Sequence, residues 1–352
     1  MKRSLSMALV LCLFLAAMPA IGIDGYPKTI VDSSNRSIIF DNPAERIVPI
    51  VAWSYEPLYI LGAQDKIVGV EKGSKAQYAY LPGIEDRPVV GTYREPDYEK
   101  IIELKPDLVI VQPKYLAQVD EKLTPLGINV VCLPFNQQSA FDGELCTLAD
   151  ILGPEEKERA QEFISWKKST LDSLKKDVDK IDASSRIRVY GEWSDTPWYT
   201  GSKLSGLDDV ITLAGGDNIA GPLNPEENLS LRYPTVDPEW VLKENPQAII
   251  FPAFDYFTGY LQQDANNATQ LIQQAKVREG LNKTDAVRND RLYVLDAYLI
   301  EAVRGFIGAQ YLARLFYPEE MADLDPEAVH KEYYESWLHV PYQGLWTYPE
   351  AG

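Results

Sequence analysis

The sequence predicts an α/β protein of two similar lobes with mainly parallel sheets, joined by one long helix, with a ligand cleft between the lobes. Three features of the 352-residue chain lead to this fold class: a stretch that occurs twice, apolar runs that alternate with helical segments, and one long helical stretch near the middle. Helices that alternate with buried apolar strands are typical of a parallel sheet covered on both faces.

The repeat relates residues 96–111 to residues 236–251. The first copy reads PDYEKIIE followed by KPDLVIV, and the second reads VDPEWVLK followed by NPQAIIF. In each copy an acidic segment predicts a short helix, a proline ends it, and an apolar run predicts a buried strand. A second pair precedes the two copies, because residues 61–69 (LGAQDKIVG) resemble residues 213–221 (LAGGDNIAG). Related elements in the same order predict two lobes of similar build.

The N-terminal lobe is expected to span residues 23–153. Tryptophan, serine and tyrosine at positions 53–55 predict a turn that opens a helix, and Glu56 in the first helical turn favours that reading. A second helix is expected after the first repeated segment, at residues 116–126. The apolar runs predict four strands, at residues 46–51, 66–70, 108–111 and 129–133.

The connection between the lobes is expected to be a helix within residues 154–182. Apolar residues recur there at helical spacing among many Glu and Lys residues, and Pro154 suits a first helical turn. No glycine interrupts residues 154–181, so at 1.5 Å per residue the helix would be roughly 40 Å long. That length exceeds one small domain, which indicates a strut between two lobes.

The C-terminal lobe is expected to span residues 183–317, followed by an aromatic-rich tail at residues 318–352. Strands are predicted at residues 188–190, 248–251 and 291–295, and a helix at residues 302–315. Aromatic side chains as dense as those of the tail favour packing against a lobe over exposure to solvent.

The first 22 residues have the composition of an export signal. Lys2 and Arg3 precede an almost wholly apolar run, and small residues follow it. We therefore expect an exported protein that works in the periplasm or at the cell surface. Cleavage near Gly22 is favoured over an uncleaved segment that tethers the chain, and lipid attachment through Cys12 is disfavoured because small residues do not precede it.

Net charge limits the classes of partner, and cysteine content limits the possible disulfides. The formal net charge is −18, and because residues 1–22 carry only Lys2 and Arg3, their removal takes it to −20. Such a surface repels nucleic acid and anionic lipid, so we expect no nucleic-acid partner. Cys132 and Cys146 remain after processing. Export permits a disulfide between them, and the alternative that Cys132 is simply a core residue stays open.

Motifs for enzymatic chemistry are absent from the sequence. His330 and His339, both in the tail, are its two histidines, and there is no nucleophile elbow, zinc-binding helix or phosphate-binding glycine loop. We therefore expect no catalytic residues, no resident cofactor and no protein-ligated metal, and hence no enzyme. A secreted carboxylate-dependent hydrolase stays open as the rival class because acidic residues are plentiful.

Several segments together resemble the substrate-binding proteins of ferric-siderophore, haem and cobalamin ABC importers. They cover roughly residues 37–315 and read NPAERIV at 42–48, EPL at 56–58 before LGA at 61–63, KIVGV at 66–70, LKPDLVI at 104–110 and NDRLYVLD at 289–296. The resemblance implies two α/β lobes bridged by one long, stiff helix, with small lobe closure and a monomeric chain. It also implies that one glutamate on each lobe docks into an arginine pocket of the membrane permease. By position in the motif these are Glu99 and Glu239.

The ligand is expected at loops that follow the carboxyl ends of the strands. Aromatic rings offer flat apolar walls, and arginine or lysine meets anionic groups. The side chains that we select for ligand contact combine these two types: Trp53, Tyr55, Tyr93, Arg94, Lys114, Trp193, Trp198, Arg232 and Tyr298. Arg94 and Trp198 are favoured among them. A ferric chelate ranks first as the bound small molecule, cobalamin or another corrinoid second, and molybdate or tungstate third.

Overall fold

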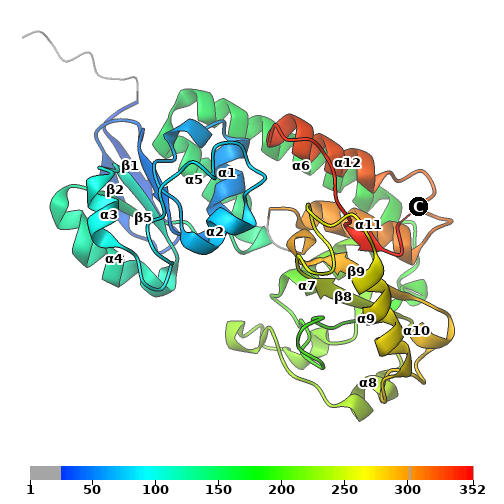
Figure 1. Ribbon diagram of the computed structural model, residues 1–352. Coiled ribbons are helices and arrows are strands. Elements are labelled where there is room, and N and C mark those ends of the chain that lie inside the picture. Colours follow the sequence, from blue (N-terminus) through cyan, green and yellow to red (C-terminus); the bar gives the residue numbers. More distant parts are fainter. Residues whose placement is uncertain (1–24, 301–302, 352) are drawn as a thin grey trace, which may run out of the picture.

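The computed structural model describes residues 25–300 and 303–351, and it confirms the predicted fold class. Two α/β lobes are joined by the long helix α6 (Pro154–Val178), which runs along one side of both (Figure 1). The helix therefore ends four residues before the end of the predicted range, 154–182. The predicted export signal at residues 1–22 lies outside the described residues.

The N-terminal lobe contains a three-stranded parallel sheet in the order β3 (Ile47–Pro49), β4 (Leu108–Val111), β5 (Asn129–Cys132). The predicted strand at residues 66–70 is wrong. This segment changes its partner within two residues, because the Val68 amide bonds to β3 whereas the Val70 amide bonds to Pro88, and no ladder can form. The helices of this lobe are α1 (Tyr55–Ile60), α2 (Lys72–Gln77), α3 (Tyr98–Glu103), α4 (Leu116–Leu123) and α5 (Gln138–Leu152).

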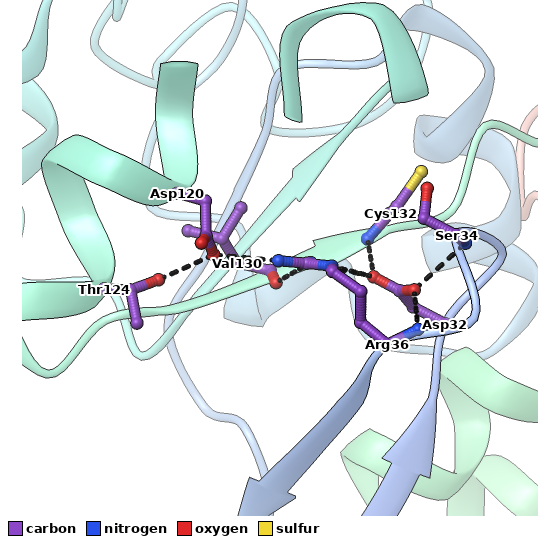
Figure 2. Close-up of polar contacts among 7 residues, drawn as sticks. All are labelled: Asp32, Ser34, Arg36, Asp120, Thr124, Val130 and Cys132. Atoms are coloured by element: carbon purple, nitrogen blue, oxygen red, sulfur yellow. Dashed lines mark hydrogen bonds and ion pairs between the residues drawn. The ribbon is translucent and has the colours of Figure 1, made fainter. Parts of the chain in front are cut away.

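A hairpin of β1 (Lys28–Val31) and β2 (Ser37–Phe40) docks onto this sheet through a buried carboxylate (Figure 2). Asp32 accepts hydrogen bonds from the backbone amides of Ser34, Arg36 and Cys132, each at 3.0 Å. Its Oδ2 also pairs with Arg36 Nη2 at 2.8 Å, and Arg36 Nη1 reaches Asp120 Oδ1 on α4 at 2.9 Å. This network connects the hairpin with β5 and α4.

The C-terminal lobe contains a five-stranded sheet in the order β10-β9-β8-β6-β7. β7 (Asp217–Asn218), β6 (Arg188–Gly191), β8 (Ala248–Ala253) and β9 (Leu292–Asp296) are parallel. The helices of this lobe are α7 (Gly206–Leu213), α8 (Pro238–Glu244), α9 (Asn266–Val277), α10 (Asp285–Arg288) and α11 (Gly305–Phe316). The sequence repeat is therefore a structural repeat, α3–β4 in one lobe and α8–β8 in the other.

The aromatic tail packs back onto the molecule, as predicted. Helix α12 (Pro326–Glu332) lies beside α6 in Figure 1 and continues into a π-helical turn, Tyr333–Trp337. Strand β10 (Thr347–Tyr348) then adds to the sheet antiparallel to β9. Tyr333 and Tyr334 are fully buried, so the tail is part of the core.

Alternate strand residues face two different cores. Those that face α6, such as Ile110 in β4 and Ile250 in β8, join one continuous core that includes α11 and the tail. Their neighbours face the other side of each sheet. Val109 belongs to a separate core of the N-terminal lobe, and Ile249 belongs to a separate core of the C-terminal lobe. Cys132 and Cys146, the cysteines within the described residues, are both free, the first buried and the second exposed, so they form no disulfide with each other. Within residues 25–300 and 303–351, no helix has the length and apolar character needed to cross a membrane.

Candidate ligand-binding cleft

A cavity of about 350 Å³ lies between the lobes at the carboxyl ends of the strands. The N-terminal lobe contributes Trp53, which follows β3, and Asn136, which follows β5. The C-terminal lobe contributes the segments after β6 and β8 and the loop before α8. Its lining residues are Trp193, Asp195, Thr196, Tyr199, Leu204, Gly206, Arg232, Tyr233 and Phe254.

The walls of this cavity are mainly aromatic. Trp193 stacks on Phe254 with a centroid distance of 5.6 Å and meets Tyr233 edge-on at 6.3 Å. The guanidinium of Arg232 lies 5.3 Å from the centroid of the Tyr233 ring. Trp193 Nε1 is buried and has no hydrogen-bond partner among the described residues. The cavity therefore offers flat apolar faces, one cation at Arg232 and one carboxylate at Asp195.

An ion pair between a buried carboxylate and a partly exposed arginine supports the segment that carries Trp193. Glu192 is 1 % exposed, and its Oε1 pairs with Arg278 Nη2 at 2.5 Å. Its Oε2 accepts hydrogen bonds from the Tyr190 hydroxyl at 3.1 Å and the Trp198 amide at 3.0 Å. Burial raises the pKa of Glu192, and the charge of Arg278 opposes that rise. These contacts fix the backbone on both sides of the 193–199 turn.

Further cavities adjoin the first one. A cavity of about 730 Å³ and another of about 500 Å³ share Asn136 with it, and the larger also shares Arg232. A smaller cavity of about 110 Å³, referred to below as the hinge-side cavity, is lined by tyrosines that include Tyr298, together with Asp255 and Arg304. Phe254 meets Tyr298 edge-on at 5.4 Å and so stands between the 350 Å³ cavity and the hinge-side cavity.

The structure brings some of the predicted ligand-contact residues together. Trp53, Trp193 and Arg232 line the same 350 Å³ cavity, and Tyr298 lines the hinge-side cavity. Tyr55 is instead fully buried in the N-terminal lobe, where its hydroxyl donates to the Pro49 carbonyl at 2.9 Å and accepts from the Glu71 amide at 2.8 Å. For all of them, ligand contact stays a prediction.

The remaining predicted residues do not line this cavity. Arg94 lies over the Tyr93 ring at 5.2 Å, and Lys114 lies over the adjacent Tyr115 ring at 5.6 Å, so these residues form a separate cluster on the N-terminal lobe. Trp198 does not line the 350 Å³ cavity either. Its ring stacks on Arg278 at 4.5 Å, and its backbone has a φ of 65°.

Sequence reasoning missed several lining residues, among them Asn136, Thr196 and Leu204. Their position was the available signal, since Asn136 closely follows β5 and Thr196 closely follows β6. They were passed over because their side chains are neither aromatic nor basic.

Glu99 and Glu239, the predicted docking residues, are both exposed and occupy equivalent places. Each lies in the first turn of its helix, α3 or α8, after an aspartate whose side chain caps that helix. In Figure 1 the two helices lie on different lobes, away from α6. Exposure leaves both carboxylates accessible to a partner.

Histidines and carboxylates are possible metal ligands within residues 25–300 and 303–351. Among the described residues, no group of three or more His, Cys, Asp or Glu side chains could hold a metal ion. His330 is fully buried in the tail, where burial lowers its pKa well below the usual range.

Comparison with known proteins agrees with this architecture. The model of the periplasmic binding protein family matches residues 50–299. The uncharacterized ABC transporter substrate-binding lipoprotein YvrC of Bacillus subtilis is 25% identical over 304 residues, which cover 84% of this chain and 87% of that protein. The cobalamin-binding protein of Halobacterium salinarum is 26% identical over 230 residues, which span 64% of this chain and 58% of that protein.

Solved structures show the same fold. The molybdate-binding protein MolA of Haemophilus influenzae, solved with molybdate bound, superposes with a TM-score of 0.71 at 19% identity and covers 90% of this chain and 99% of its own. Two lobes, a single connecting helix and a cavity at the carboxyl ends of the strands accompany the sequence match. The chain belongs to the periplasmic binding protein family.

Proposed function

We propose that this protein captures a metal chelate, first of all a ferric-siderophore-like one, in the interlobe cleft and delivers it to the permease of an ABC importer. The observation that carries the proposal is the aromatic cavity between the lobes of a chain that belongs to this family. The protein would act outside the cytoplasm after export directed by residues 1–22.

Cavity size and chemistry support a chelate. A volume of about 350 Å³ lies within the usual range for small-molecule sites, and the adjoining cavities extend it. Stacked rings of Trp193 and Phe254 suit the flat apolar parts of a large ligand, and Arg232 suits catecholate or carboxylate oxygens. A corrinoid ranks second because it too is large and partly flat. Molybdate or tungstate ranks third because a small oxyanion would leave most of the aromatic wall unused.

Titration calorimetry on the purified protein tests the ligand class. A ferric catecholate, a ferric hydroxamate, cyanocobalamin and molybdate would each be titrated into the parent chain and into Arg232→Ala. We expect a ferric chelate to bind most tightly and Arg232→Ala to weaken that binding. Arg288→Ala is the matched control, because Arg288 lies on α10 in an exposed pair with Asp285. Tight binding of molybdate with no binding of either chelate would reject the ranking.

Delivery to the permease would use Glu99 and Glu239. Carboxylates paired with arginine form charge-assisted, often bidentate contacts, and two of them fix both the orientation and the register of a complex. In a transport assay, Glu99→Ala combined with Glu239→Ala should abolish uptake and leave ligand affinity unchanged. Glu103→Ala is the control, since Glu103 is an exposed acid at the other end of α3. Unchanged uptake in the double variant would show that the docking assignment is wrong.

The rival class, a secreted carboxylate-dependent hydrolase, gives a different result in the same experiments. A binding protein returns its ligand chemically unchanged after incubation, whereas a hydrolase produces cleaved products. Mass spectrometry of the ligand recovered from the complex separates the two.

A further inference from the structure

A buried ion pair between residues outside α6 connects the two lobes. Glu56 belongs to α1 of the N-terminal lobe, and Arg304 directly precedes α11 of the C-terminal lobe. We infer that this pair and the C-terminal tail form an interlobe clamp, made of Glu56, Tyr80, Tyr260, Arg304, Tyr333 and Tyr334, which holds the lobes at one angle and keeps the cleft open in a fixed shape.

The polar centre of the clamp is the Glu56 carboxylate, which accepts four hydrogen bonds. Arg304 donates to both carboxylate oxygens of Glu56, at 2.5 Å from Nη2 and 3.1 Å from Nε. The hydroxyls of Tyr80 and Tyr333 donate to the same carboxylate at 2.8 Å and 2.6 Å. Glu56 is 1 % exposed and Arg304 is 3 % exposed. Three segments thus meet at one buried carboxylate: the N-terminal lobe, the C-terminal lobe and the tail.

Aromatic rings surround this centre. The Arg304 guanidinium lies 5.7 Å from the Tyr334 ring centroid and 5.9 Å from that of Trp346, both in the tail. Tyr80 of the N-terminal lobe stacks on Tyr260 of the C-terminal lobe at 4.5 Å, and Tyr260 stacks on Tyr334 at 5.4 Å. The stack crosses from one lobe to the other and ends on the tail.

The tail is held where it completes the clamp. The Gly259 amide donates to the Leu345 carbonyl at 2.7 Å, and the Tyr260 hydroxyl donates to the Pro341 carbonyl at 2.9 Å. Gly344 has a φ of 108°, and a Cβ there would lie 2.5 Å from the Gly259 carbonyl oxygen, so the two loops touch backbone to backbone. Residues 318–351 lie outside the matched range of 50–299, so the clamp depends on a segment beyond the family model.

Buried charge explains why such a clamp would select one angle. A change of angle that separates Glu56 from Arg304 before water reaches them leaves two buried charges unpaired, which is strongly unfavourable. The stacked rings add a geometric requirement, because offset stacking is lost when one lobe tilts. The clamp therefore opposes opening and closing motions that a single connecting helix would still permit. This inference does not depend on which ligand binds.

Distance measurements between the lobes test the clamp in the ligand-free protein. One spin label is placed on native Cys146, which is exposed on α5, and the other on Gln270→Cys, which is exposed on α9. Cys12 is replaced with Ser, and Cys132 is buried and stays unlabelled. Pulsed dipolar spectroscopy should give a single narrow distance distribution for the otherwise unchanged chain.

Two clamp variants should widen that distribution and shift its mean. Glu56→Gln removes the ion pair. Tyr260→Ala removes the half-buried ring that stacks on both Tyr80 and Tyr334, so it remains informative if Glu56→Gln does not fold. Tyr256→Ala is the matched control from the same loop, because Tyr256 is 66% exposed and outside the clamp. A distribution that stays narrow in folded Tyr260→Ala would overturn the inference, and the ligand-binding experiments above would be unaffected by that outcome.

Discussion

Removal of the Arg278 charge should destabilise the C-terminal lobe and make its stability depend more strongly on pH. Arg278 Nη2 is the cationic partner of Glu192, which is 1 % exposed. Arg278→Met keeps much of the side-chain length and its packing near Trp198 but leaves the carboxylate without a counter-charge. Breaking a buried pair in this way costs about 3–5 kcal/mol at neutral pH.

The pH dependence follows from the direction of the Glu192 pKa. Burial already raises this pKa above 4.5, the value expected for the unfolded chain, and loss of Arg278 raises it further because the cation opposes the rise. Between the unfolded and folded pKa values the folded protein binds more protons, so stability falls as pH rises through that window. Arg278→Met should therefore be closer to the parent chain at pH 5 than at pH 8.

Urea unfolding at several pH values measures both effects. The matched control is Arg288→Met, because the pair of Arg288 with Asp285 is solvent-exposed and worth less than about 1 kcal/mol. Adding Glu192→Gln to Arg278→Met should recover part of the loss and remove the additional pH dependence that Arg278→Met introduces. A loss of under about 1 kcal/mol in Arg278→Met, equal at pH 5 and pH 8, would refute the reasoning.

Three other perturbations have expected outcomes. Burial raises the pKa of Asp296 to about 7 against the opposing charge of Arg304. The free energy of unfolding should therefore fall by up to about 4 kcal/mol as pH rises from 4 to 8. Asp296→Asn should make this pH dependence smaller in urea titrations. Burial alone would raise the pKa of Asp32, but hydrogen bonds from Arg36 and Cys132 lower this pKa overall. The stability that Asp32 provides is therefore present above pH 4 and lost below it. Asp32→Asn should unfold more easily at pH 7, and its free energy of unfolding should fall less steeply as the pH drops below 4. Phe163→Ala on α6 should cost about 3–5 kcal/mol in thermal unfolding, because its fully buried ring contacts rings from α5, α11 and the tail.

Local patterns predicted the repeated units well. The apolar run of β4 and the glycine-free stretch of α6 are continuous in the sequence, so each carries its own signal. The segment at residues 66–70 has the same apolar character as a strand, yet its backbone partners are set by neighbours distant in sequence. Pattern alone could not exclude a ladder there.

The candidate site was harder to predict because its geometry depends on distant partners. Trp53, Trp193 and Arg232 combine the right chemistry with the right place relative to strand ends. Tyr55 has the same chemistry and a similar place, but one helical turn directs its ring into the lobe interior. The sequence around Glu56 indicated only a favourable interaction with the N-terminal end of its helix. Its ion-pair partner Arg304 lies 248 positions further along the chain, so no local pattern could reveal the pair.

Strand β10 has a practical consequence for work on this protein. It covers the outer edge of β9, through the pairs Thr347 with Leu295 and Tyr348 with Val294. Without it, the apolar β9 would present unpaired backbone donors and acceptors, which invite strand addition by another molecule. A chain that ends before Thr347 would therefore expose this edge and self-associate, so shortened versions of the protein should keep residues 347–348.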